Sequence, residues 1–327
     1  MNIAVIGLGN IGFRHFQSIL TLRKNHKLFL VDNSSDALDK CKKYYFETFN
    51  EKQCIFFYNN IQKIVTKIDI LVIATSSYPR RSIIEEVFKY QKPKYMILEK
   101  FLFPFIEDFQ ICEQLFKFNS TKVWVNQWMS QEFIEINQYF PNNKNMSFSV
   151  NGKNWGLCSN SVHFIDWFHK MTGRERLEIY NKNLSNQLSE SRRKDYHELM
   201  GNLEIKSLSG HTLKLKCEKK LDLEEIDKRS IFIDISNIDY DFVAEFDGKS
   251  LNYEVTNKNT NSSIKKEIIV KPQSKKTSEI IKCLVESDTC NLVDYRISME
   301  QHLLIFNIFK ETFAANGYNT NNGIPVT

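Results

Sequence analysis

The sequence lacks the patterns that mark membrane, secreted and zinc-binding proteins. In its 327 residues no apolar run approaches the roughly 20 residues that a helix needs to span a bilayer. The seven cysteines include no C-x-x-C pair, which argues against a zinc ribbon or a disulfide framework and is typical of a reducing cytosol. Met1 leads straight into an apolar run rather than into a signal peptide. We therefore expect a cytoplasmic protein without a membrane partner.

The excess of positive over negative charge is also small. Lys and Arg number 44 against 39 Asp and Glu, which leaves a net charge of +5. The basic clusters, such as residues 192–194 and 265–266, are short and do not form the stripe that a nucleic-acid site requires, so no nucleic-acid partner is expected. Internal repeats and low-complexity linkers are absent as well, and the length suggests two domains.

The first 125 residues alternate between apolar runs and amphipathic segments. The runs show no polar alternation, which is typical of strands that are buried on both faces. The predicted strands are Ile3–Ile6, Leu28–Val31, Cys54–Phe57, Ile70–Ala74, Tyr95–Glu99 and Val123–Asn126. This alternation predicts an α/β Rossmann domain with a doubly wound parallel sheet over residues 1–125.

From residue 126 the pattern changes. Several period-2 segments separated by turns predict an α+β domain with an open, mostly antiparallel sheet over residues 126–327. Two helices, Thr277–Glu286 and Ile297–Phe313, are expected after this sheet, and they can pack back on the first domain. The Asn- and Gly-rich tail, Asn316–Thr327, is expected to be a poorly ordered arm or a capping loop.

A glycine-rich turn follows the first predicted strand. Gly7, Gly9 and Gly12 have the G-x-G-x-x-G spacing: the first glycine permits a tight turn, the second lets the backbone approach a pyrophosphate, and the third lets the helix pack closely on the strand. The start of that helix offers free N–H groups and a positive dipole end to phosphates. We therefore expect a dinucleotide to bind at this turn, on Gly7, Leu8, Gly9, Asn10, Ile11 and Gly12.

An acidic residue ends the second predicted strand. Asp32 follows Gly12 by about 20 residues, the spacing at which a carboxylate accepts a hydrogen bond from a ribose 2′-hydroxyl. Such a carboxylate repels a 2′-phosphate, so we expect NAD as the cofactor, with Asn33 in the same site. Ser34 and Ser35 can still hydrogen-bond a 2′-phosphate, which leaves NADP as an alternative.

Three further strand ends belong to the same predicted site, because ligands bind outside the carboxyl ends of parallel strands. They carry Ala74, Thr75 and Ser76, then Glu99 and Lys100, and finally Asn126 with Trp128 after it. Lys100 is the strongest candidate, because an ammonium close to a nicotinamide can act as a general acid or hold a substrate oxygen. The alternative is a surface lysine on a loop.

His163 and Asp166 lie on the predicted helix 161–171. The i,i+3 spacing puts both on one face, which resembles part of a metal site or a catalytic triad, and the alternative is a core histidine. No third ligand stands with them, so no metal is expected. Trp128 and Trp155 are candidates for stacking on a sugar ring or a base, and packing in the core is the alternative.

These residues, taken in order, resemble the Gfo/Idh/MocA oxidoreductases, and the resemblance covers both halves of the chain. It rests on four stretches: Gly7-x-Gly9-x-x-Gly12-x-Arg14-His15, Ala74-Thr75, Glu99-Lys100 and His163-x-x-Asp166. It implies a Rossmann domain followed by a substrate-binding domain whose open sheet often builds a dimer or tetramer interface. It also implies hydride transfer between NAD(P) and a carbon that bears a sugar hydroxyl.

The resemblance also implies roles for single residues. Lys100 would anchor the substrate hydroxyl and share the proton transfer, and His163 would take the hydroxyl proton in the oxidation direction. Glu99 and Asn126 would lie by the nicotinamide. The stretch Asn154–His163 resembles the pattern of a subgroup associated with sugar biosynthesis for bacterial surface polysaccharides. Asn160, which lies within this stretch, is a further substrate-binding candidate.

The chain departs from the family pattern mainly at the substrate end. A family proline is Phe101 here, a family histidine is Arg80, a family aspartate is Ser159 and a family arginine is Trp128. Two functions therefore stay open. One is an active NAD(P)-dependent sugar or nucleotide-sugar dehydrogenase or reductase, assembled as a homodimer or homotetramer. The other is a catalytically impaired nucleotide-binding regulatory or scaffold protein of the same fold.

Overall fold

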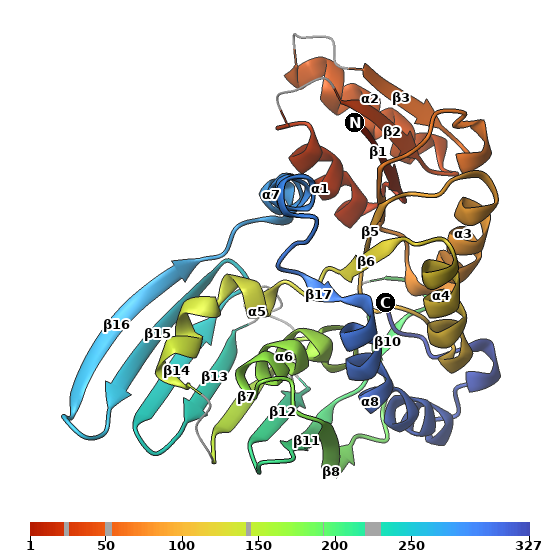
Figure 1. Ribbon diagram of the computed structural model, residues 1–327. Helices are drawn as coiled ribbons and strands as arrows, with labels where there is room; N and C mark the ends of the chain where they lie inside the picture. The colour runs from red at the N-terminus through yellow and green to blue at the C-terminus, as the bar shows by residue number, and fades with distance from the viewer. Residues whose placement is uncertain (23–25, 50–53, 142–144, 192, 220–229) are drawn as a thin grey trace. The chain divides into compact units, whose positions relative to one another are not determined.

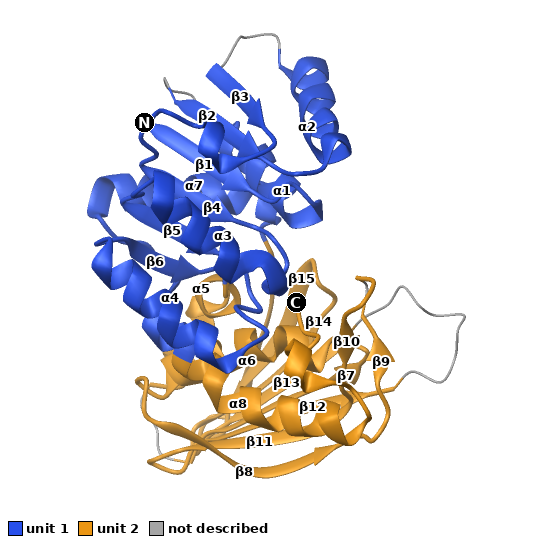
Figure 2. Cartoon of the chain, turned by 90° about the vertical axis from the view of Figure 1, so that its right-hand side faces the viewer, with its two compact units in different colours: residues 1–126, 271–299 blue, residues 127–270, 300–327 orange. Residues whose placement is uncertain are grey.

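The computed structural model describes residues 1–22, 26–49, 54–141, 145–191, 193–219 and 230–327. The chain forms two compact units, each built from two segments (Figure 2). Unit 1 comprises residues 1–126 and 271–299, and unit 2 comprises residues 127–270 and 300–327. A segment from the last fifth of the chain thus completes the N-terminal unit.

A parallel sheet forms the centre of unit 1. Its strands are β1 (Asn2–Ile6), β2 (Lys27–Val31), β3 (Cys54–Tyr58), β4 (Ile70–Ile73), β5 (Tyr95–Leu98), β6 (Lys122–Val125) and β17 (Val293–Asp294). Over the described residues their order is β17-β6-β5-β4-β1-β2-β3, with β17 antiparallel to β6 and the other neighbours parallel (Figure 1). Every residue of β4 and β5 is buried, as their unbroken apolar runs require. The predicted doubly wound sheet is confirmed.

Helices pack on this sheet. They are α1 (Asn10–Ile19), α2 (Ser35–Thr48), α3 (Ser77–Tyr90), α4 (Ile106–Phe118) and α7 (Gln273–Ser287), with a short 3-10 helix η1 (Ile61–Lys63). α7 lies beside α1 (Figure 1), and its residues Ile280 and Leu284 share a buried cluster with Phe16 of α1. Between the two helices, the N–H of Ser278 donates to Ser18 Oγ at 2.9 Å. α7 therefore contributes to the core of unit 1.

Unit 2 contains a second, mostly antiparallel sheet. Its strands are β7 (Ser147–Lys153), β8 (Leu177–Leu184), β11 (Gly201–Ser207), β12 (Thr212–Glu218), β13 (Ile231–Ser236), β14 (Tyr240–Phe246), β15 (Ser250–Asn257) and β16 (Ser262–Ile269). Over the described residues their order is β16-β15-β14-β13-β7-β12-β11-β8, with β7 and β12 parallel and the other neighbours antiparallel. This confirms the predicted open sheet. A separate small ladder joins β9 (Ser189–Glu190) and β10 (His197–Glu198).

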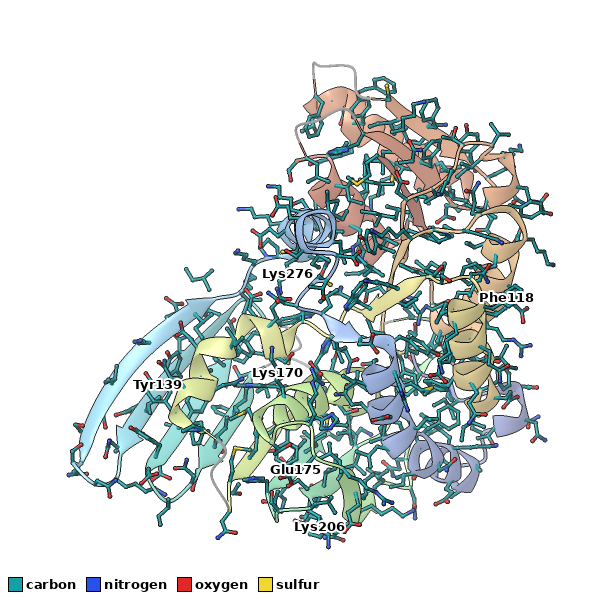
Figure 3. All side chains as sticks on the ribbon, in the orientation of Figure 1. Phe118, Tyr139, Lys170, Glu175, Lys206 and Lys276 are labelled. Carbon is teal, nitrogen blue, oxygen red and sulfur yellow. The ribbon has the colours of Figure 1, made fainter. Side chains whose placement is uncertain are left out.

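One face of this sheet is covered by a helix. This helix is α6 (Leu157–Met171). Further helical elements of the chain are α5 (Met129–Glu132), the 3-10 helix η2 (Ile134–Tyr139) and α8 (Tyr295–Ala315). Phe148 of β7 meets Trp167 of α6 edge-on, with ring centroids 5.0 Å apart. Lys206 of β11 lies on the outer face, away from α6 (Figure 3), where it pairs with Glu178 at 2.9 Å. Within the described ranges, no helix combines the length and the hydropathy needed to cross a membrane.

The end of the chain packs on unit 2. After the short 3-10 helix η4 (Thr320–Asn322), Ile324 and Val326 are buried. The N–H of His197 donates to the carbonyl oxygen of Pro325 at 2.8 Å, which attaches the tail to β10. The tail is therefore a capping segment and not a poorly ordered arm.

Candidate cofactor and catalytic residues

The turn between β1 and α1 leaves no room for side chains at two of its glycines. Gly7 has a φ of +86°, and a Cβ there would lie 2.7 Å from Thr75 Cγ2. A Cβ on Gly12 would lie 1.7 Å from the carbonyl oxygen of Gly7, so the close approach of α1 to β1 requires glycine. Gly9 differs, since a Cβ there would meet no described atom within 4 Å. The surface above Gly9 is thus open to a pyrophosphate.

The N-terminus of α1 adjoins this open position. Gly9 is the N-cap residue, and none of the described side chains caps the helix. Asn10 is exposed and Ile11 is half-buried, so the first turn is accessible. The unsatisfied N–H groups and the positive dipole end of this helix favour an anion.

Asp32 connects the glycine turn to the start of α2. The residue follows β2 and is half-buried, whereas Asn33 beside it is exposed. Its Oδ2 accepts the N–H of Leu8 at 2.6 Å, and its Oδ1 accepts the N–H of Ser34 at 2.8 Å. Each carboxylate oxygen can accept a further hydrogen bond. The acid is therefore held in place with acceptor capacity left for ribose hydroxyls.

The end of β4 contributes a small polar segment. Ala74 is buried, Thr75 is half-buried, and Ser76 is the N-cap residue of α3. Thr75 Oγ1 is buried and has no hydrogen-bond partner within the described part of the chain. Buried hydroxyls are nearly always hydrogen-bonded, so this atom is a place where a bound ligand would complete the structure.

A buried arginine connects the loops after β4 and β5. Arg80 of α3 is 0% exposed and donates from Nη2 to the carbonyl oxygen of Thr75. Its Nη1 donates to the carbonyl oxygens of Phe101 and Leu102, the latter at 2.7 Å. In the sequence Arg80 is only a departure from the family pattern. Its clamping role has no sequence signal, because it depends on backbone atoms of two distant loops.

Lys100 lies in a segment that is otherwise buried. Lys100 itself is half-buried, and Phe101, Leu102 and Phe103 are each 0% exposed. The peptide bond between Lys100 and Phe101 is cis. The buried side chains and the Arg80 clamp hold the backbone at the carboxyl end of β5. Lys100 therefore projects from a fixed segment rather than from an exposed loop.

Glu99 and Asn126, which follow β5 and β6, belong to a buried ring of hydrogen bonds. Glu99 Oε1 accepts from His15 Nε2 at 2.9 Å and from Asn126 Nδ2 at 2.5 Å. Asn126 Nδ2 also donates to Gln273 Oε1 at 3.1 Å, and Gln273 Nε2 donates to Thr277 Oγ1 at 3.0 Å. Thr277 Oγ1 lies 2.8 Å from His15 Nδ1, which closes the ring.

The ring holds an ionised carboxylate. Burial raises the pKa of Glu99, but the hydrogen bonds from His15 and Asn126 and the charge of Lys100 outweigh burial, so the pKa lies below its ordinary value. Glu99 therefore acts as a hydrogen-bond acceptor. Sequence reasoning placed Glu99 and Asn126 in the site and missed Gln273 and Thr277, since their contacts arise only when α7 packs beside α1.

In unit 2 the structure brings Trp128 and His163 together. His163 of α6 is 3% exposed, and its ring centroid lies 5.5 Å from that of the half-buried Trp128. Trp128 also contacts Phe133 and Phe246 edge-on, with centroid distances of 6.2 Å to each. These aromatic contacts fix the position of Trp128 against one side of the histidine ring.

Asp166 takes part in a network with neighbouring helices. Ser130 Oγ of α5 donates to Asp166 Oδ2, and Gln301 Nε2 of α8 donates to Asp166 Oδ1 at 3.0 Å. Gln127 Nε2 donates in turn to Gln301 Oε1 at 2.9 Å. The carboxylate of Asp166 therefore holds α5, α6 and α8 together. Sequence reasoning missed Ser130 and Gln301, which lack any motif spacing.

Trp155 and Asn160 make contacts within unit 2. Trp155 is 3% exposed, packs edge-on against Phe164 and donates from Nε1 to the carbonyl oxygen of Lys216 at 2.8 Å. Asn160 Nδ2 donates to the carbonyl oxygen of Trp155 at 2.6 Å. The contacts of Trp155 are those of a core residue, the alternative that its sequence left open. Substrate binding by these two residues stays a prediction.

The two units together define a class of protein, a dinucleotide-binding Rossmann domain combined with an α+β domain. Residues 1–127 match the sequence model of the GFO_IDH_MocA family, described as an oxidoreductase family with an NAD-binding Rossmann fold. The match assigns the NAD-binding domain of this oxidoreductase family to residues 1–127, and NAD(P) is the cofactor class of that domain, as the motifs predicted. A comparison with curated protein sequences finds no match.

Solved structures share the fold over nearly the whole chain. UDP-N-acetylglucosamine 3-dehydrogenase from Acidithiobacillus ferrooxidans has a TM-score of 0.68 at 11% identity, covering 97% of this chain and 96% of that one. A 3-ketoreductase from Actinomadura kijaniata has a TM-score of 0.68 at 10% identity, covering 100% and 98%. The transcriptional regulator Gal80p from Kluyveromyces lactis has a TM-score of 0.67 at 14% identity, covering 97% and 92%. At these identities the likeness establishes the fold alone.

Proposed function

We propose that the protein is an NAD(P)-dependent oxidoreductase that transfers a hydride between nicotinamide and the hydroxyl or keto carbon of a sugar or nucleotide sugar. The observation that carries this proposal is the intact cofactor turn, in which Gly7 and Gly12 have no space for a side chain and Gly9 is open. The fold shared with UDP-N-acetylglucosamine 3-dehydrogenase and the 3-ketoreductase supports the substrate class. A cytoplasmic role in the biosynthesis of bacterial surface polysaccharides is part of the proposal.

The residues of unit 1 fit a bound NAD(P), which would supply or accept the hydride. The backbone at Gly9 and the N-terminus of α1 would hold the pyrophosphate. Asp32 would accept the ribose hydroxyls, and its charge favours NAD over NADP. The buried oxygens Thr75 Oγ1 and Asn126 Oδ1, which have no partner among the described residues, would gain hydrogen bonds.

Lys100 and His163 are the residues proposed to handle the proton. In the oxidation direction, the imidazole of His163 is proposed to accept the proton of the substrate hydroxyl, and the ammonium of Lys100 is proposed to donate a hydrogen bond to the substrate. In the reduction direction, the proton returns to the carbonyl oxygen. Trp128, which packs on His163, limits the orientations of the imidazole.

The test is turnover with a panel of keto sugars and nucleotide sugars, followed by the loss of NADH absorbance. Lys100→Met and His163→Asn should each lower turnover by about 100-fold or more, while NADH still binds. Lys92→Met changes an exposed lysine of the same unit and should leave turnover unchanged. Full turnover in both active-site variants would remove the assigned roles.

A catalytically impaired nucleotide-binding regulatory or scaffold protein is the second candidate. Phe101 and Ser159, which depart from the family pattern, favour it, and the fold shared with Gal80p supports it. This candidate predicts NADH binding without hydride transfer to any member of the panel. Hydride transfer that is lost in Lys100→Met excludes it.

The outer face of the sheet in unit 2 is the proposed interface of a homodimer or homotetramer. Phe232 of β13 and Val243 of β14 are 51% and 49% exposed there, on neighbouring strands. Contiguous exposed apolar patches with a polar rim are typical of association surfaces. Light scattering should report two or four chains, and Phe232→Glu should shift the mass toward one. Val65→Glu, at an exposed valine of unit 1, is the matched control.

A further inference from the structure

The side-chain amide of Asn126 has hydrogen-bond partners at its nitrogen, whereas its oxygen has none among the described residues. Its side chain is 2% exposed, and Nδ2 donates to Glu99 Oε1 and to Gln273 Oε1. Its Oδ1 is buried and lacks a hydrogen-bond partner among the residues that the structure describes. Native proteins rarely bury a carbonyl oxygen without a donor, so this oxygen points to a ligand.

The ring of hydrogen bonds determines which end of the amide is unsatisfied. The carboxylate of Glu99 can only accept, so the Asn126 atom that faces it must be the N–H donor. Gln273 also presents its oxygen to Asn126, because its Nε2 donates to Thr277 Oγ1. Rotating the Asn126 amide by half a turn would place its oxygen against two acceptors. Asn126 therefore offers an acceptor, and not a donor, at its free end.

The free oxygen belongs to the half of the sheet that lies opposite the adenosine side. The glycine turn and Asp32 follow β1 and β2, whereas Asn126 follows β6, on the other side of β4 and β5. In doubly wound sheets the dinucleotide lies across the carboxyl ends of the strands, with one mononucleotide on each half. With the adenosine ribose at Asp32, the nicotinamide falls to the half that carries Asn126.

We infer that Asn126 Oδ1 accepts a hydrogen bond from the carboxamide NH2 of nicotinamide, and that Gln273 and Thr277 of α7 are positioning residues that hold the amide in this orientation. The inference rests on the proposed function and specifies the chemical group that this end of the site recognises. The carboxamide is the substituent of the nicotinamide ring that carries N–H donors. A ring with an acetyl group in its place has none.

The test compares the binding of NADH with that of reduced 3-acetylpyridine adenine dinucleotide, in which a methyl ketone replaces the carboxamide. Binding is measured because the replacement also changes the reduction potential. The protein should bind NADH about 10- to 100-fold more tightly, since the analogue leaves the buried oxygen of Asn126 without a donor. Equal affinities overturn the inference. Failure of NADH itself to bind would overturn the proposed function instead, so the two failures are distinguishable.

Variants of α7 test the positioning role. Gln273→Met removes the second acceptor of the Asn126 amide. In this variant the affinities for NADH and for the 3-acetylpyridine analogue should differ by no more than about threefold. Affinity for ADP-ribose, which has no nicotinamide ring, should stay unchanged. Thr277→Val should weaken the preference, and Thr277→Ser, which keeps the hydroxyl, should restore it.

The matched control for these variants is Ser278→Ala. It removes a buried hydroxyl of the same helix that bonds Ser18 of α1 outside the ring. The preference should be kept in this variant. An unchanged preference in Gln273→Met overturns the positioning role, and so does an equal loss in Ser278→Ala, because general packing of α7 would then explain both.

Discussion

The carboxylate of Asp32 accepts a hydrogen bond from the backbone N–H of Leu8 at 2.6 Å, so the acid after β2 is anchored in the glycine turn after β1. Its other oxygen is fixed by the N–H of Ser34 at 2.8 Å. The turn and the acid thus form one preorganised structure, and a ligand need not order either of them. A change at Asp32 acts on the turn as well as on ribose recognition.

Replacing Asp32 with Asn should lower the affinity for NADH about 10- to 100-fold, since hydrogen bonds to a charged group are worth about 1.5–3 kcal/mol. The preference for NADH over NADPH should narrow, because the charge that repels a 2′-phosphate is gone. Fluorescence titration with both cofactors measures this. Asp36→Asn, at an exposed acid in the first turn of α2, should change neither affinity. Tighter binding of NADPH than of NADH by the unchanged protein would contradict the role of Asp32.

Two alanine variants of the glycine turn should separate binding from stability. Gly9→Ala adds a methyl group that meets no described atom within 4 Å, so the free energy of unfolding should change by only about 0.5 kcal/mol. NADH affinity should nevertheless fall at least about tenfold, because the methyl group blocks the approach of the pyrophosphate. Gly12→Ala should lower the free energy of unfolding by about 1–3 kcal/mol or more, since its Cβ would overlap the oxygen of Gly7. Urea unfolding and NADH titration check both, and wild-type affinity in Gly9→Ala would place the pyrophosphate elsewhere.

The parallel sheet could be predicted because each strand is a local pattern. The runs that form β1 to β6 are apolar without interruption, and burial on both faces explains them. β17 could not be predicted, since Val293 and Asp294 are too short a stretch to show a period. The packing of α7 on α1 was left open for a related reason. An amphipathic helix reveals its apolar face in the sequence and not the partner that covers it.

The same distinction between local patterns and long-range contacts holds for the candidate site. Gly7, Gly9 and Asp32 were found because backbone geometry dictates their spacing. Arg80 and Gln273 were not found in their positioning roles, because each joins atoms from segments far apart in the chain. Buried hydrogen bonds of this kind need only a donor and an acceptor at the right place, so they leave no period or motif behind.

Arg80 should be essential for the stability of the loops that carry Thr75 and Lys100. Arg80→Met leaves buried carbonyl oxygens without their donors and should lower the free energy of unfolding by about 3–5 kcal/mol. Arg80→Lys should recover only part of this loss, because an ammonium lacks the planar fork that reaches several acceptors. Turnover should fall in both variants.

Arg81→Lys is the matched control for Arg80. Arg81 is the neighbouring residue, partly exposed, and it bonds Glu85 at 3.0 Å and Asp108 at 2.9 Å. A lysine can keep one of these ion pairs, so the loss should stay within about 1 kcal/mol. Urea unfolding of the three variants provides the comparison. If Arg80→Met proved as stable as Arg81→Lys, the clamp would not be needed.

The buried carboxylate of Glu99 should make the stability of unit 1 depend on pH. Although burial raises its pKa, the hydrogen bonds from His15 and Asn126 and the charge of Lys100 bring the pKa in the folded state below the ordinary value of 4.5. A group with a lower pKa in the folded state stabilises that state above its unfolded pKa. The contribution is lost as the pH falls below about 4.5 through the folded pKa.

Glu99→Gln is the variant that tests this dependence. At about pH 7 it should unfold at lower urea concentration than the unchanged protein, because an amide replaces the acceptor that His15 and Asn126 share. The difference in the free energy of unfolding should shrink as the pH falls from about 4.5 through the lower folded pKa, where Glu99 of the unchanged protein becomes protonated as well. Glu107→Gln, at an exposed glutamate of α4, should show no such change. A difference that stays constant from about pH 7 to about pH 3 would mean that the shape of the side chain matters at this position and its charge does not.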